Sequence, residues 1–319
     1  MTEPFSSVFG PGSVSLRLYP HNDLPAPDIV DELRRQAVTG AAAGFDGVMV
    51  SEHHGGFAGY LPNPIQTAGF LLDATDAVWV APAPLLLPLR PAALVAEELA
   101  WLAARHPGRV GVGVAAGALP LDFTVMDLDV ADAVARFKAD LPRVTAMLRG
   151  EDLGELAGDP ALRACADRPV PVVSAAVSPT AGRRAASLGA GILLESMSTL
   201  ERQRAVVDAF RATGGTGPCV VIRRVWLGAP PDAAIRSQRA VYESYSPAAA
   251  QQHWAEQNVL VDDDAGALAA RVVESVRAVD GDAVNLRVHL PDVGPDEIRD
   301  QIAALGATVV PEVRGAISR

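Results

Sequence analysis

Three consecutive residues, Glu52, His53 and His54, place a carboxyl group and two imidazole groups one residue after an apolar run that ends at Val50. Imidazoles and carboxylates are the groups that most often move protons in catalysis. Glycines 55, 56 and 59 follow and allow the backbone to turn into a loop. A short apolar run between glycines is typical of a buried parallel strand, and α/β proteins hold their chemistry at the carboxyl ends of such strands. The sequence therefore predicts a site at this strand end.

Three interpretations of the two histidines remain open. Adjacent residues of a strand point to opposite faces, so both rings face one metal ion only if the strand is irregular. The H-x-H spacing typical of a dinuclear metal barrel is also absent, and we predict no metal site. A structural interpretation has one ring hydrogen-bonded inside a barrel mouth and the other packed behind the loop. We favour the third interpretation, in which a site histidine exchanges protons with a bound cofactor or substrate.

A second candidate is the stretch S-P-T-A-G-R-R at residues 178–184, which follows an apolar strand and opens a helix. Hydroxyl groups and free N–H groups coincide there with the positive end of a helix dipole, which suits a phosphate group. The same pattern also fits an ordinary helix start, with Ser178 as N-cap and Pro179 in the first helical position. The glycines of G-V-G-V-A-A-G at residues 111–117 do not have dinucleotide spacing, and they favour close approach of a ligand or backbone instead.

The elements that must position these residues alternate between strand and helix along the chain. The expected strands cover residues 13–19, 48–50, 78–89, 109–117, 170–177, 191–195, 219–227 and 283–290. The expected helices cover residues 28–44, 64–72, 90–106, 131–148, 179–188, 199–213, 259–278 and 295–305. Eight such strands predict a single (β/α)8 TIM barrel domain over residues 1–319, with a doubly wound open sheet as the alternative.

Two segments depart from the alternation. The strand over residues 78–89 contains Pro82, Pro84 and Pro88, and because proline removes a ladder donor we expect this strand to leave the sheet early. Residues 226–254 form a longer and irregular segment that holds four of the eight Trp and Tyr residues, Tyr242 among them. These aromatic residues are expected either to line a substrate pocket or to pack an outer helix against the barrel.

The composition excludes several classes of partner. The chain has 27 basic and 38 acidic residues and a net charge of −11, which offers no footprint for nucleic acid or an anionic membrane. Cys165 and Cys219 are far apart and outside any C-x-x-C pair, so neither a zinc cluster nor a disulfide framework is indicated. No apolar run reaches membrane-spanning length, and no basic start precedes an apolar stretch. We expect a cytoplasmic protein.

Four stretches together resemble the bacterial luciferase-like flavin-dependent monooxygenase family, the LLM class oxidoreductases. They are S-E-H-H-G-G-F-A-G-Y-L-P-N-P at residues 51–64, A-P-L-L-L-P-L-R-P-A-A-L-V-A-E-E at 83–98, G-R-V-G-V-G-V-A-A-G at 108–117, and S-P-T-A-G-R-R-A-A-S-L-G-A-G at 178–191. They occur in family order. The resemblance implies a (β/α)8 barrel that binds FMN, or in one branch the deazaflavin coenzyme F-420, at the carboxyl ends of its strands.

The resemblance also assigns positions in the cofactor site. Ala83-Pro84 falls where the family often has a cis peptide under the flavin ring; proline lowers the cis penalty from about 3 kcal/mol to below about 1 kcal/mol, so we predict a cis peptide. Ala116 stands where luciferases place an arginine near the phosphate, and Arg183 or Arg184 is expected to replace it. The cofactor contacts implied by the resemblance are Ala83, Pro84, Ala116, Gly117, Ser178, Thr180 and Arg183.

For catalysis, His53 matches the histidine that assists flavin oxygen chemistry in luciferases, with Glu52 and His54 beside it. The hypothesis that we favour is a two-component monooxygenase that receives reduced FMN from a separate flavin reductase and uses O2 on a small organic substrate. The alternatives are a deazaflavin-dependent hydride-transfer enzyme, a barrel without catalytic activity and, more distantly, a metal-dependent hydrolase. Oxygen consumption, flavin retention and metal analysis discriminate them. A homodimer is expected from the resemblance alone.

Overall fold

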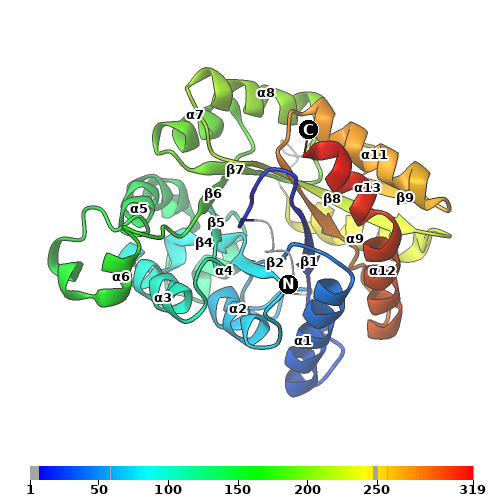
Figure 1. Ribbon diagram of the computed structural model, residues 1–319, viewed down its shortest axis with the longest axis horizontal. Helices are drawn as coiled ribbons and strands as arrows, with labels where there is room; N and C mark the ends of the chain where they lie inside the picture. Colours follow the sequence, from blue (N-terminus) through cyan, green and yellow to red (C-terminus); the bar gives the residue numbers. More distant parts are fainter. Residues whose placement is uncertain (1–6, 58, 247–250, 257, 319) are drawn as a thin grey trace.

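The computed structural model describes residues 7–57, 59–246, 251–256 and 258–318, and in it a ring of parallel strands is surrounded by helices (Figure 1). Each strand consists largely of buried apolar residues, as parallel strands covered on both faces require. The ring strands are β1 (Val14–Leu18), β2 (Gly47–Val50), β3 (Trp79–Pro82), β4 (Leu85–Leu86), β5 (Val112–Ala115), β6 (Val172–Ala175), β7 (Gly191–Leu194), β8 (Cys219–Leu227) and β10 (Ala283–Arg287).

The strand order is β3-β2-β1-β10-β8-β7-β6-β5-β4, and every neighbouring pair is parallel. The ring closes where β3 meets β5, because Val80 and Val110 form a parallel bridge. β3 and β4 are two parts of one barrel position, interrupted at residues 83–84. Counted in this way the ring has the eight positions of a (β/α)8 barrel, which confirms the fold expected from the sequence.

The helices cover the outside of the ring, with α1, α2 and α3 on one side and α11, α12 and α13 on another (Figure 1). Several begin with proline in the first turn, where the missing N–H costs nothing. Their bounds are α1 (Ala26–Ala42), α2 (Pro64–Leu72), α3 (Ala92–Arg105), α4 (Pro120–Thr124), α5 (Ala133–Met147), α6 (Pro160–Ala164), α7 (Pro179–Ser187), α8 (Leu200–Ala212), α9 (Asp232–Tyr245), α11 (Ala265–Ala278), α12 (Pro295–Thr308) and α13 (Val310–Ile317).

Three expectations need correction in the last third of the chain. Residues 259–278 begin as strand β9 (Val259–Asp262), which pairs with β8, and only then become α11. The segment over residues 226–254 is less irregular than expected because it contains the 14-residue helix α9. The helix expected over residues 295–305 extends to Thr308, and α13 follows it.

The interior of the barrel is filled by a small apolar cluster that is closed at the amino-terminal end by aromatic rings. Phe9 meets Trp79 edge to face at 5.1 Å between ring centroids. Gly47 on β2 makes room for the indole, because a Cβ there would lie 2.1 Å from the Trp79 ring. The opposite, carboxyl-terminal end of the barrel is therefore the end that can hold a ligand.

The bond between Ala83 and Pro84 is a cis peptide, as predicted. A buried arginine of β1 holds this turn from inside the barrel: Arg17 donates from Nη1 to the Ala83 carbonyl oxygen at 2.8 Å and also to the Ser51 hydroxyl. Its Nε donates to Asn285 Oδ1 at 2.8 Å. Arg17 thus ties β1, the end of β2, the cis peptide and β10 into one mouth.

Candidate functional site

His53 lies at the barrel mouth, and its ring is held by a buried carboxylate. Nδ1 of His53 is 2.7 Å from Oδ2 of Asp122, while the side chain of Asp122 is fully buried and that of His53 is 17% exposed. An ionised carboxylate can only accept, so Nδ1 carries the proton and Nε2 becomes the basic nitrogen of the ring. The pair therefore orients an imidazole for proton exchange through Nε2.

Asp122 reaches this position because the chain after β5 turns into the short helix α4, which begins at Pro120. Its second oxygen, Oδ1, accepts from the main-chain N–H of His54 at 2.8 Å, so the carboxylate is fixed at both oxygens. The loop packs closely here, since a Cβ on Gly55 would lie 2.8 Å from Leu121. Asp122 was not among the site residues expected from the sequence.

Glu52 and His54 point away from His53 and form a separate buried network. Glu52 Oε1 lies 2.9 Å from His54 Nε2 and 2.7 Å from Arg90 Nη2, and its Oε2 accepts from the Leu86 N–H at 2.6 Å. These contacts anchor the chain that follows residues 83–84 to the end of β2. The structural interpretation of the histidines, with one ring in the mouth and one behind the loop, describes this arrangement. Glu52 and His54 are thus placed to support the site rather than to meet a ligand.

The rim formed by β4, β5 and β6 carries small side chains. Ala83 is fully buried, whereas Pro84, Ala115, Ala116 and Ala175 are partly exposed. Larger apolar groups surround this rim and remain exposed, Leu121 at 40%, Val125 at 46%, Met126 at 38% and Val177 at 55%. Gly117 beside them has φ +76°, a conformation that glycine adopts without strain. Small apolar side chains at such a rim would let a planar ring system approach the strand ends closely.

Helix α7 begins at the edge of that rim, directly after β6. Ser178 is its N-cap, with Oγ accepting from the Ala181 N–H at 3.3 Å, which confirms the helix-start interpretation. Thr180 and Arg183 are exposed in the first turns, and Arg183 Nη2 donates to Thr180 Oγ1 at 3.2 Å. A hydroxyl group, a guanidinium group and the positive end of a nine-residue helix therefore meet in solvent beside the small residues. A phosphate group fits that set of donors.

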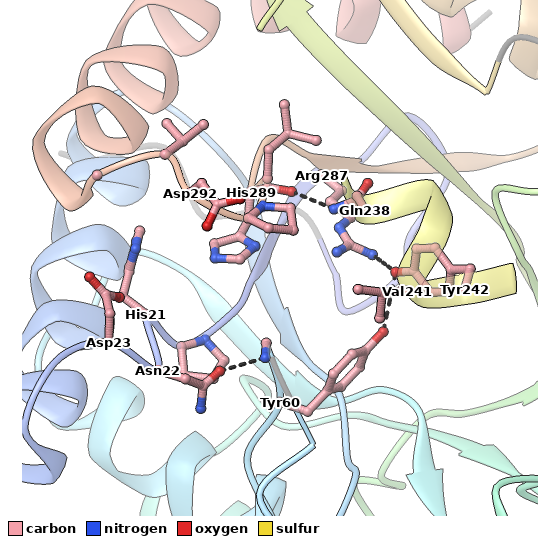
Figure 2. A pocket seen from close by; sticks show the side chains of 16 residues that line it. His21, Asn22, Asp23, Tyr60, Gln238, Val241, Tyr242, Arg287, His289 and Asp292 are labelled. Carbon is pink, nitrogen blue, oxygen red and sulfur yellow. Dashed lines mark hydrogen bonds between the residues drawn. The ribbon is translucent and has the colours of Figure 1, made fainter. Parts of the chain in front are cut away.

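A cavity of about 310 Å³ opens on the other side of the mouth, between the ends of β1 and β10 and the helix α9 (Figure 2). Tyr60 forms part of its wall and also packs against His53, with ring centroids 4.4 Å apart. Tyr242 of α9 lies across from Tyr60, and the two hydroxyl oxygens are 3.4 Å apart. Of the aromatic residues in the segment 226–254, Tyr242 thus lines a cavity, as one of the two expectations had it. Trp226 instead is buried and donates to the Ala229 carbonyl oxygen.

Two buried arginines set the electrostatics of this cavity. Arg287 of β10 donates to the Tyr242 hydroxyl and stacks over the Tyr19 ring at 3.8 Å. Arg224 of β8 lies over the Tyr242 ring at 4.6 Å. Burial alone would raise the pKa of the Tyr242 phenol, but the charges of Arg287 and Arg224 outweigh it and lower the pKa to about 8. The phenol of Tyr242 thus ionises at a lower pH than an ordinary tyrosine.

Two kinds of site find no support in the part of the chain that the structure describes. No group of three or more His, Cys, Asp or Glu side chains gathers there in a way that could hold a metal ion. Among the same residues, no helix combines the length and apolar character that crossing a bilayer demands.

Comparison with known proteins gives the fold and the family. Many solved structures resemble the chain, among them the following three, which do so over nearly its whole length. Monooxygenase RslO1 from Streptomyces bottropensis is 19% identical, with 94% of this chain and 99% of that chain covered and a TM-score of 0.78. The oxygenating constituent of 3,6-diketocamphane monooxygenase from Pseudomonas putida, in complex with FMN, is 16% identical, with 94% and 99% covered and a TM-score of 0.74.

An F420-dependent secondary alcohol dehydrogenase, in complex with an F420-acetone adduct, is 18% identical, with 94% of this chain and 98% of that chain covered and a TM-score of 0.71. At these identities the likeness shows the fold alone. The family model described as luciferase-like monooxygenase matches residues 13–311, from the first barrel strand to the start of α13. The chain therefore belongs to the luciferase-like monooxygenase family.

Proposed function

We propose that the protein is a flavin-dependent oxidoreductase, and more narrowly the oxygenase of a two-component monooxygenase that takes reduced FMN from a separate flavin reductase. The observation that carries the proposal is the position of the His53–Asp122 pair between an apolar rim of small residues and a cavity that contains Arg287 and His289. A flavin on the rim and a small organic substrate in the cavity would then meet at one imidazole. Family membership and a neighbour solved with FMN support the same assignment.

The residues present fit such a cofactor. Pro84, Ala115 and Ala175 are small and partly exposed, so they would leave room for the ring system at the strand ends, and larger side chains at these positions would occupy that room. Thr180 and Arg183 at the start of α7 would bind the phosphate, with Ser178 capping the helix that presents them. Arg183 in this position would supply the charge that Ala116 does not.

A bound reduced flavin supplies the electrons and the reaction with O2. The protein itself supplies a proton path and a dry environment. Nε2 of His53 would give or take a proton at the reacting centre, and the Asp122 carboxylate would stabilise the imidazolium form that results. Phe57 and Tyr60 pack on the His53 ring at 4.9 and 4.4 Å between centroids, and thereby shield it from bulk water.

Equilibrium binding of oxidised FMN, reduced FMN and oxidised deazaflavin to the full chain tests this proposal. We expect reduced FMN to bind most tightly, and Arg183→Met to weaken binding by up to about fivefold, which is the effect of losing one exposed charge pair. Arg163→Met removes an exposed arginine from the remote helix α6 and is the matched control. Parallel melting curves verify that each variant is folded.

Each outcome has a distinct meaning. A preference for the deazaflavin would move the assignment to the hydride-transfer branch, in line with the F420-dependent neighbour. Failure of all three cofactors to bind at about millimolar concentration, that is, binding weaker than about −4 kcal/mol, would refute the flavin enzyme and leave a barrel without a cofactor. Oxygen consumption with reduced FMN then separates an oxygenase from an inactive flavin-binding barrel.

A further inference from the structure

Positive charge at the cavity beside α9 lacks a carboxylate partner among the described residues. Arg287 lines the cavity, and Arg224 stacks on the ring of Tyr242, which also lines it. Arg224 is 3% exposed and Arg287 is 6% exposed, and neither forms a salt bridge with an acidic side chain in the part of the chain covered by the structure. Their contacts are to phenols, hydroxyls and an amide. Burying a guanidinium group is costly unless it is paired. A site that keeps two such groups is built to receive a negative charge.

Polar atoms that line the same cavity also lack hydrogen-bond partners. Within the described residues, Arg287 Nε, His289 Nδ1 and Gln238 Oε1 are buried and accept or donate no hydrogen bond, although each could. Buried polar atoms in folded proteins are nearly always paired, so three such atoms gathered at one cavity are suited to bind a polar group of a ligand. Figure 2 shows the side chains of Arg287, His289 and Gln238 converging from β10 and α9.

His289 contributes a neutral ring to this arrangement. Burial lowers its pKa well below the ordinary value, and the neighbouring charges of Arg287 and His21 lower it further. The ring stacks on Tyr19 at 5.4 Å and meets His21 at 5.1 Å between centroids. A neutral imidazole can donate one hydrogen bond without adding a second repulsive charge beside Arg287.

We propose that this cavity binds the carboxylate group of a small organic acid, with Arg287 and His289 as the recognition residues. The carboxylate would receive N–H donors from both side chains, and the apolar body of the acid would lie against Val241, Leu290 and Val293. The inference rests on the proposed function, because the acid would be the substrate of that oxidoreductase. Tyr60 joins the cavity to His53, so the bound acid would extend toward the proton-exchanging ring.

A carboxylate suits the site better than a phosphate group. Asp23 and Asp292 lie exposed at the cavity rim and oppose the entry of a dianion more strongly than that of a monoanion. The volume of about 310 Å³ is at the lower limit for ligand pockets. The cavity is also separate from the phosphate donors of α7, because β8 and β7 lie between β10 and β6 in the sheet.

Calorimetric titration of the wild-type full chain with matched acids and amides tests the inference without any variant. The probes are acetate, butyrate, cyclohexanecarboxylate and benzoate, each compared with its own amide, in a buffer free of chloride and carboxylates. We expect at least one acid to bind about tenfold more tightly than its amide, which corresponds to about 1.4 kcal/mol. If every acid binds no better than its amide, the inference is overturned.

Variants then identify the residue responsible. Arg287→Met is expected to abolish the preference for the acid, Arg287→Lys to retain part of it, and Arg236→Met, which removes an exposed arginine from α9, to leave it intact. If the preference survives in a folded Arg287→Met protein, Arg287 is not the recognition residue and the inference is wrong. Should Arg287→Met fail to fold, Arg287→Lys and His289→Phe provide the same comparison.

The two proposals can fail independently. Acids that bind to a protein unable to bind any flavin would leave the carboxylate site standing and refute the flavin enzyme. Flavin binding accompanied by equal affinity for acids and amides would refute the carboxylate site alone.

Discussion

Replacing Asp122 by asparagine should move the proton of the His53 ring from one nitrogen to the other. In the wild-type protein Asp122 accepts two hydrogen bonds, from His53 Nδ1 at 2.7 Å and from the His54 N–H at 2.8 Å. The asparagine side chain has nearly the same shape but offers one acceptor and one donor. The backbone N–H of His54 can only donate, so the amide oxygen must remain with it. The amide NH2 then faces Nδ1 of His53.

Because the amide NH2 donates, Nδ1 must become the acceptor and the proton moves to Nε2. Nε2 of His53 would then no longer be the basic nitrogen of the ring. The stability cost follows from the two bonds. Hydrogen bonds to a charged group contribute about 1.5–3 kcal/mol each and neutral ones about 0.5–1.5 kcal/mol, so the free energy of unfolding should fall by roughly 2 kcal/mol. Asp122→Ala, which leaves two buried donors without acceptors, should cost more.

Long-range proton–nitrogen NMR spectra distinguish the two neutral tautomers directly, without substrate or cofactor. The chain has six histidines, and His53→Gln identifies the signals of His53 by their loss. Asp300→Asn, which makes the same change at an exposed position of α12, is the control and should alter neither tautomer nor stability. The reasoning is refuted if His53 keeps its proton on Nδ1 in a folded Asp122→Asn protein, or if the wild-type protein already carries it on Nε2.

Three further predictions concern other parts of the molecule. The pKa of Tyr242 is about 8, against an ordinary value of 10.0. A pH titration of phenolate absorption should therefore show a step with its midpoint near 8, and Tyr242→Phe should lack this step. Because the pKa of Tyr242 is lower in the folded state, this group raises the free energy of unfolding as pH rises from about 8 to 10. A titration in which every tyrosine has an ordinary midpoint would contradict the effect assigned to Arg287 and Arg224. Glu52→Gln breaks the buried pair with Arg90 and should lower the free energy of unfolding, measured with denaturant, by about 3 kcal/mol. Arg34→Gln removes the exposed pair with Asp31 and should lower it by less than about 1 kcal/mol. Equal losses in the two variants would contradict this prediction. Burial raises the pKa of the Cys219 thiol to about 12, so a thiol reagent should modify Cys219 only after the protein unfolds. Mass spectrometry follows the modification, and rapid labelling of Cys219 in the native protein would contradict this prediction.

The barrel itself could be predicted from the sequence because its signal is local. Buried parallel strands appear as short apolar runs such as 48–50 and 219–222, and each is followed by a helix with a clear start. Strand β9 was missed because its four residues, V-L-V-D, run directly into the start of α11, and a short apolar run beside a helix has no period of its own. The cis peptide at residues 83–84 was predictable because proline marks it.

The partners in the site were not predictable in the same way. Asp122 lies 69 positions from His53, and no spacing rule connects a residue of α4 with the end of β2. Arg224 and Arg287 did leave a signal, since each interrupts a run of apolar residues in a strand, C-V-V-I-R-R-V-W-L and A-V-N-L-R. A charge inside a buried strand must find a partner or a ligand. Both strands could be predicted from their apolar residues, but the groups that their arginines face depend on contacts between distant parts of the chain.

The order of the strands explains why the two halves of the mouth differ in character. β3, β5 and β6 present small residues on one side, while β1, β10 and β8 present aromatic and cationic residues on the other. β2 lies between β3 and β1, so the residue at its end borders both halves. His53 is tied to the first half through Asp122 after β5 and to the second through Tyr60. A proton-exchanging group shared by two different ligands would have to lie at the end of this strand, where the histidine is found.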